Sequence, residues 1–185
     1  MYLYILIAVV VVLGYLVLVY NGLITLKNRT KEAWSDIDVQ LKRRYDLIPN
    51  LVKVVQGYAK QEKEVFENVT KARATAISAQ GAQEQAKAEN ALSSTLKTLF
   101  AVAEAYPTLR SSENFKALQD ELSDTENKIS SARRFYNSNV RDFNTKLEVF
   151  PNNILGGAFG FKNFELFQLP AEQKEVATEP PKVEI

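Results

Sequence analysis

The chain has 185 residues, enough for one domain and a membrane anchor, and its 23 basic and 22 acidic side chains leave a formal net charge of +1. This balance argues against a nucleic-acid-binding protein, which usually carries a clear basic excess. Cys and His are both absent, so the chain lacks thiolate nucleophiles, the commonest transition-metal ligand and the usual general base. We therefore expect no catalytic residue, no metal site and no cofactor.

Residues 1–26 are predicted to form a transmembrane anchor. No charged side chain precedes Lys27, and a helix over residues 3–26 would be about 36 Å long, enough to cross a hydrocarbon core of roughly 30 Å. Tyr4 and Tyr20 flank the apolar run, where we expect their rings to lie at the two membrane interfaces. A cleaved signal peptide would need basic residues before the run and a small-residue cleavage site after it, and the sequence offers neither. We interpret the segment as a retained anchor.

Three basic residues follow the anchor directly: Lys27, Arg29 and Lys31. No Lys or Arg lies on its N-terminal side. Because the cytoplasmic flanks of membrane helices carry an excess of Lys and Arg, this asymmetry predicts a single-pass protein with its N-terminus outside and its domain in the cytoplasm.

The residues after the anchor carry apolar side chains at helical spacings of three and four, with charged residues between them. We expect the membrane helix to run on into an antiparallel all-α bundle, with helices over about residues 27–78, 84–106 and 113–150. Pro49 is the one interior disruption, because proline lacks a backbone donor and disfavours helix at the residue before it. A kink at Pro49 would leave three long helices, whereas a break there would make four. The lack of a polar turn around Pro49 favours the kink.

The last of these helices shows the clearest apolar stripe, which extends over about five heptads with one stutter near Tyr136. Such a stripe is typical of a coiled-coil seam, and it must be covered by the other helices. Its residues are Phe115, Leu118, Leu122, Thr125, Ile129, Ala132, Tyr136, Val140, Phe143, Leu147 and Phe150.

The composition changes beyond residue 150. Residues 151–168 are rich in Gly and Phe, and we expect Gly156, Gly157 and Gly160 to exclude a regular helix. Residues 169–185 contain Pro and Glu and are predicted to form a disordered tail.

The segment from Ala33 to Val52, with the sequence AWSDIDVQLKRRYDLIPNLV, resembles the signature of the LemA family of bacterial membrane proteins. Shorter matches extend the resemblance from Tyr20 to Phe167, among them EAYP at residues 104–107, LQDEL at 118–122, ENKI at 126–129 and FGF at 159–161. The resemblance implies a single-pass protein of the bacterial cytoplasmic membrane with an antiparallel helical bundle. It implies no enzymatic activity and no cofactor.

Regularly spaced polar residues form one candidate site. Three lie just before Pro49 and four lie beside the stripe of the last helix: Arg43, Arg44, Asp46, Glu126, Arg133, Asn137 and Asn144. One interpretation is a buried hydrogen-bond network that fixes the register between helices. The others are a ligand or proton site and a solvated helix face.

The aromatic segment provides a second candidate, a patch for binding a partner that consists of Ile154, Phe159, Phe161, Phe164 and Phe167. These residues either fold back to cap the end of the bundle or stay exposed to bind a protein or a lipid surface. With three long helices the last helix would end far from the membrane, and the segment would meet a protein. A reversal at Pro49 would return the segment to the bilayer.

Together these features predict a membrane-anchored helical scaffold or adaptor that contacts the lipid bilayer and an unidentified protein partner. A homo-oligomer that organises or remodels the membrane is one variant. A sensor that transmits a signal through the continuous helix and Pro49 is another alternative. An enzyme with Glu126, Arg133 and Asp46 in a bundle-core site is the least supported, because carboxylate metal sites in such bundles use Glu-x-x-His pairs and this chain has no His.

Overall fold

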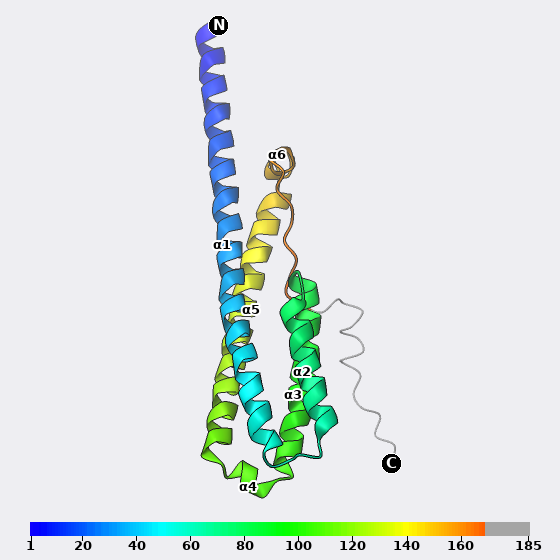
Figure 1. The fold of residues 1–185 in the computed structure, drawn as a ribbon. Helices are drawn as coiled ribbons and strands as arrows, with labels where there is room; N and C mark the ends of the chain where they lie inside the picture. Colours follow the sequence, from blue (N-terminus) through cyan, green and yellow to red (C-terminus); the bar gives the residue numbers. More distant parts are fainter. Residues whose placement is uncertain (169–185) are drawn as a thin grey trace, which may run out of the picture. The chain divides into compact units, whose positions relative to one another are not determined.

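The computed structural model describes residues 1–168 (Figure 1), so the tail predicted to be disordered over residues 169–185 lies outside the described residues. The elements are α1 (Tyr2–Gln56), α2 (Lys63–Ser78), α3 (Ala82–Glu104), α4 (Pro107–Arg110), α5 (Glu113–Glu148) and α6 (Asn152–Ala158). Residues 1–168 contain no strand. The prediction of an all-α protein, in which a long apolar N-terminal helix is followed by further helices, is confirmed.

The chain divides into two compact units. We call the first the anchor unit; it consists of residues 1–39 and 130–165. The second, which we call the four-helix unit, consists of residues 40–129 and 166–168 among the described residues. Helices α1 and α5 each contribute to both units.

Helix α1 runs without interruption through Pro49. A proline lacks the amide that would donate to the carbonyl four residues earlier, which here is the carbonyl of Tyr45. The Nε of Arg73 in α2 donates to that oxygen at 2.8 Å instead. Ile48 and Leu51, on either side of Pro49, are fully buried. The replacement hydrogen bond and this packing let the helix continue, so the chain does not break at Pro49.

The first reversal of the chain comes later, and the single helix predicted over residues 27–78 is therefore wrong. Helix α1 ends at Gln56 and α2 begins at Lys63. The amide of Ala59 donates to the carbonyl of Val55 at 2.9 Å to close the turn, and Ala59 itself is fully buried. Because buried Ala59 occupies the turn, the helical spacing of the apolar residues carries on past it, although Gly57 and the polar residues 60–62 lie in the turn.

In the four-helix unit, the last part of α1 and the first part of α5 pack with α2 and α3 around one hydrophobic core (Figure 1). Leu51, Val69, Leu92 and Leu122 represent the four helices in this core. Helices α2 and α3 lie side by side and are joined by a short turn, where the sequence predicts one. Gly81 in this turn has a φ of 82°, a conformation that side chains other than glycine rarely adopt.

In the anchor unit, α1 packs against the second part of α5 and against α6. Val19 and Leu23 of α1 are buried together with Phe143 and Leu147 of α5. Phe150, predicted to continue the stripe of α5, is instead highly exposed. The helix ends at Glu148 because a residue that precedes a proline, here Pro151, is disfavoured in the helical conformation.

The expectation that the glycines beyond residue 150 exclude a helix is wrong, since α6 spans Asn152–Ala158. Gly156 explains why this short helix forms here. A Cβ atom at this position would lie 2.1 Å from the Cδ1 of Leu147 and 4.0 Å from the Cδ1 of Leu23. The missing side chain therefore lets α6 approach α5 and α1 closely, and the packing gained offsets the low helix propensity of glycine.

Candidate functional sites

The aromatic segment after α5 returns to α1 within the anchor unit. The ring of Tyr20 lies 5.1 Å from that of Phe159 and 6.0 Å from that of Phe161, measured between centroids. Phe143 of α5 lies 5.2 Å from Phe164 and 6.2 Å from Phe161. Edge-to-face contacts of this kind stabilise aromatic pairs beyond their buried area. We call these five residues the aromatic cluster.

A cation completes the cluster. The Nζ of Lys27 lies 5.5 Å from the centroid of the Phe161 ring, a distance at which an ammonium group is attracted to the ring face. Lys27 is the first charged side chain after the apolar run of α1. The aromatic cluster therefore covers α1 just where its uncharged stretch ends.

Hydrogen bonds to α5 hold the backbone of the aromatic segment. The side-chain amide of Asn144 donates to the carbonyl of Phe164 at 2.9 Å and accepts from its amide at 3.0 Å. The hydroxyl of Tyr136 donates to the carbonyl of Glu165 at 2.9 Å. Burial raises the pKa of Tyr136 to about 12, and the nearby charge of Glu165 adds to this rise. Tyr136 therefore stays a neutral donor at physiological pH.

Of the layouts considered for this segment, the one with three long helices, which would place it far from the membrane helix, is wrong. The reversal after Gln56 adds a fourth long helix, so the last one, α5, runs back toward the N-terminal part of α1. The contacts of Phe159 and Phe161 with Tyr20 show the result.

The residues of the predicted partner patch have different environments. Phe161 and Phe164 are half-buried in the anchor unit, Phe167 is fully buried, and Ile154 and Phe159 are exposed. Two further apolar side chains in this region, Val149 and Phe150, are also exposed. Neither belongs to the predicted patch, because the spacing of Phe150 continues the helix stripe. The proline that follows Phe150 is the signal that could have excluded it from the helix.

The predicted polar residues are likewise divided. Arg44 and Glu126 form an ion pair in the four-helix unit, with Nη1 and Oε2 3.1 Å apart. Arg43 lies nearer the surface and pairs with Glu121 at 3.1 Å and with Asp124 at 3.6 Å.

The other predicted polar residues have different environments. Asp46 is exposed, and Asn144 binds the backbone of the aromatic segment. Arg133 and Asn137 are half-buried residues of the anchor unit.

A buried carboxylate that is not among the predicted polar residues completes the environment of Arg44. Its Nη1 donates to the Oε2 of Glu89 at 3.0 Å, and each side chain is only 5% exposed. Its Nη2 donates to the Oγ of Ser93 at 2.7 Å. Glu89 and Ser93 belong to α3, and Glu89 occupies the apolar stripe of that helix three residues before Leu92. A charged residue on an otherwise apolar stripe is the signal that could have revealed it, because a buried charge requires a partner.

Two more side chains bind Glu89 from the other side. The hydroxyl of Tyr45 donates to its carboxylate, and the Nε2 of Gln85 donates to it at 3.1 Å. Gln85 also donates to the hydroxyl oxygen of Tyr45 at 2.9 Å. Burial raises the pKa of Tyr45 above its usual value, and the hydrogen bond to Glu89 raises it further. The phenol therefore stays protonated and donates to the carboxylate.

This network pairs the buried charges of Arg44 and Glu89, and it ties α1 to α3 and α5. Arg44 binds two carboxylates and a hydroxyl, while Glu89 accepts from Arg44, Tyr45 and Gln85. Within residues 1–168, no group of three or more Asp, Glu, His or Cys side chains could hold a metal ion. The arrangement provides structural connections between helices.

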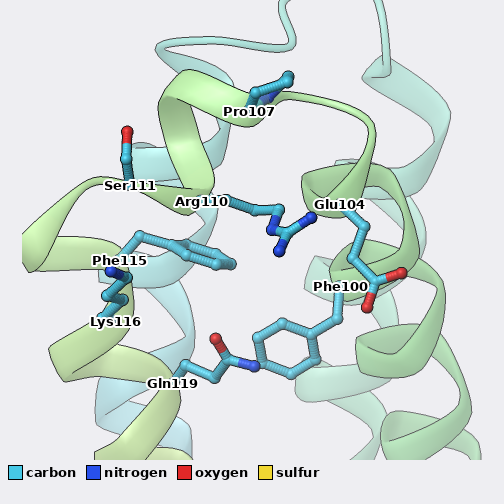
Figure 2. Close-up of a pocket in the computed structure, with 8 residues that line it drawn as sticks. All are labelled: Phe100, Glu104, Pro107, Arg110, Ser111, Phe115, Lys116 and Gln119. Atoms are coloured by element: carbon cyan, nitrogen blue, oxygen red, sulfur yellow. The ribbon is translucent and has the colours of Figure 1, made fainter.

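A surface groove runs between α3 and α5 in the four-helix unit. One hollow of about 700 Å³ is lined by Phe100, Phe115 and Arg110, and Figure 2 shows the Arg110 guanidinium pointing into it on the side of Glu104. A second hollow of about 500 Å³ shares Phe100 and Gln119 with the first. We call the two together the α3–α5 groove.

Comparison with known proteins identifies the family. The sequence profile of the LemA family matches residues 33–184, which is most of the chain. The chain belongs to the LemA family. It is 26% identical over 187 residues to magnetosome protein MamQ 2 of Paramagnetospirillum magneticum, covering 87% of this chain and 69% of the relative. It is also 26% identical over 186 residues to magnetosome protein MamQ of Magnetospirillum gryphiswaldense, covering 86% and 68%.

This LemA-family chain is a membrane protein. Within residues 1–168, α1 is the one helix long and apolar enough to cross a membrane, and nearly all of its most apolar stretch is exposed. An apolar helix that served as the core of a soluble protein would be mostly buried. The membership of the LemA family and the exposed apolar helix therefore both indicate a membrane protein.

Proposed function

We propose that this LemA-family chain is a single-pass scaffold that holds a protein partner at the cytoplasmic face of the bacterial inner membrane. The observation that carries the proposal is the continuity of α1 from Tyr2 to Gln56. Residues 2–18 expose apolar side chains, whereas Ile48, Leu51 and Val55 of the same helix are buried in the four-helix core. An unbroken helix thus joins the membrane segment to the helical bundle without a flexible linker.

The α3–α5 groove is the surface we assign to the partner. Leu96, Phe100 and Leu122 supply apolar lining, while Lys97 and Glu126 supply charges of both signs. Grooves of this type bind an amphipathic helix through apolar anchors and polar flanks. The partner is therefore expected to present a helix with apolar residues on one face.

A photoreactive phenylalanine derivative at Lys97 tests the assignment. Lys97 lines the groove and is exposed, whereas Lys87 is another exposed lysine of the same helix that lines neither hollow. Irradiation of native membranes should give a discrete protein adduct from position 97 and not from position 87. The same adducts from both positions, or none from position 97, would contradict the scaffold proposal.

Mass spectrometry of the adduct distinguishes two forms of the proposal. A second protein supports an adaptor, and a second copy of this chain supports a homo-oligomer that organises the membrane.

The orientation has its own test. Lys27, Arg29 and Lys31 support a cytoplasmic bundle through the positive-inside rule. The chain lacks cysteine, so Val39→Cys, at an exposed position of α1, provides a single labelling site. A maleimide that cannot cross membranes should label this variant only after the cells are opened. Labelling in intact cells would place the bundle outside.

A further inference from the structure

The turn between α5 and α6 and the end of α6 carry exposed apolar side chains. Phe150 is 79% exposed and Ile154 is 64% exposed, and Val149 and Phe159 are exposed as well. We call these four residues the exposed patch. The opposite side of the same segment is anchored, since Asn152 and Gly156 are buried and Leu155 packs on the core of the anchor unit. The segment is therefore held firmly while it presents apolar side chains outward.

The position of this segment along α1, relative to the hydrocarbon core of the membrane, indicates what covers the patch. Phe159 contacts Tyr20, and Gly156 lies against Leu23. Residues 2–18 form a helix of about 25 Å, which is shorter than a hydrocarbon core of roughly 30 Å. About 20 residues are needed to cross that core, so the hydrocarbon reaches the level of Tyr20 and ends near Leu23. The patch lies at the same level.

The charged side chains near the patch suit this position. Lys146 precedes the segment in sequence and Lys162 follows it, and both are exposed. Lys27 lies over the ring of Phe161. Glu148, an acidic residue next to Val149 in the chain, accepts a hydrogen bond from Asn163 at 3.2 Å. Lysine side chains beside an apolar surface favour the headgroup region of a bilayer that contains anionic lipids.

We propose that the exposed patch inserts into the lipid bilayer beside α1 and makes a second, monotopic contact with the same leaflet. The occupant is lipid because the patch is continuous with the exposed apolar surface of α1 that itself requires lipid. Short apolar segments held at the interface in this way bind in the plane of the membrane. The second contact would fix the tilt and rotation of the anchor unit on the membrane, which one helix alone leaves free.

Spin labels provide the test in the full chain, which contains no native cysteine to interfere. We would label Phe150→Cys, Ile154→Cys and the control Val39→Cys, all at exposed positions. Each protein is reconstituted alone into vesicles of phosphatidylethanolamine and phosphatidylglycerol. Power saturation then compares the accessibility of each label to oxygen, which concentrates in lipid, with its accessibility to a water-soluble nickel complex.

The proposal predicts at least a threefold higher oxygen-to-nickel accessibility ratio at positions 150 and 154 than at position 39. Nickel accessibility at 150 and 154 equal to that at 39 would place the patch in water and overturn the proposal. Labels shielded from both reagents would also overturn it, because protein from a second copy would then cover the patch. No partner protein is present, so the result does not depend on the scaffold function.

Discussion

Arg44 shows how a single residue connects three helices of the four-helix unit. Its guanidinium binds Glu89, which is buried to the same extent, and Glu126, whose side chain is 50% exposed. Both carboxylates lie about equally close to the same nitrogen. Burial rather than distance should decide how much each carboxylate contributes to the free energy of unfolding. Water screens the attraction in an exposed ion pair, whereas it screens a buried pair much less.

The two carboxylates therefore provide a matched pair of variants. Glu89→Gln leaves buried Arg44 with only a half-exposed partner, and the free energy of unfolding should fall by about 3 kcal/mol. Glu126→Gln should lower it by less than about 1 kcal/mol. Thermal unfolding in detergent, followed by circular dichroism, compares the two. Equal losses would show that burial does not set the strength of these pairs.

Tyr136 gives the anchor unit an alkaline sensitivity. Its folded pKa of about 12 lies above the ordinary value of 10.0, so between these pH values the unfolded phenol ionises while the folded one stays protonated. The unfolded state then binds fewer protons, and the stability falls as the pH rises from 10 to 12. Stability is fully retained below pH 10.

The variant Tyr136→Phe tests this sensitivity. It should lose part of the alkaline decrease, and at neutral pH it should be about 1 kcal/mol less stable because the bond to Glu165 is lost. Tyr45, whose pKa is also raised, supplies the decrease that remains. Unfolding free energies measured at pH 8 and pH 11 for both proteins decide the matter. If the free energy of unfolding of the variant fell between pH 8 and pH 11 as much as that of the original protein, Tyr136 would not be a cause of the alkaline loss of stability.

At the scale of elements, α1 and α2 are coupled through one carbonyl group. Pro49 cannot donate to the carbonyl of Tyr45, and Arg73 of α2 does so at 2.8 Å. An acceptor left without a partner in this half-buried setting costs about 1–3 kcal/mol. Helix α1 therefore depends on α2 at the position where Pro49 leaves it without one backbone hydrogen bond.

A double-mutant cycle measures this dependence. Arg73→Ala should destabilise the protein by about 1–3 kcal/mol. In a Pro49→Ala background the new amide supplies the missing donor, and the cost of Arg73→Ala should shrink to less than half. Chemical unfolding of the four proteins gives the coupling energy. Purely additive effects would show that Arg73 does not replace the donor that Pro49 lacks.

The sequence predicted some elements closely and others not at all. The stripes of Leu92, Leu96 and Leu99 and of Tyr136, Val140 and Phe143 lead to α3 and α5 within two residues of their ends, because local periodicity reports directly on helices. The turn after Gln56 was missed because buried Ala59 continues the apolar pattern. Helix α6 was missed because its formation depends on the close approach of Gly156 to Leu147 and to Leu23, and Leu23 is distant in sequence.

At the scale of the whole molecule, one missed turn changed the functional interpretation. With three long helices the aromatic segment would lie far from the membrane, whereas four long helices bring Phe159 and Phe161 back to Tyr20. Glu89 was not predicted as the partner of Arg44 because the two lie 45 residues apart on different helices. Local patterns predict elements, but only the number of reversals decides which ends of the helices meet.

The central claim is that the chain returns to α1 at the point where α1 leaves the membrane. It is tested most directly in native membranes with Tyr20→Cys combined with Phe159→Cys, a short bifunctional maleimide, and a protease site inserted at residues 79–81. The two fragments should stay linked after cleavage. The control pair, Tyr4→Cys with Phe159→Cys, should not link them because Tyr4 lies about 24 Å further along the helix. Fragments that separate for the first pair as they do for the control would contradict the account.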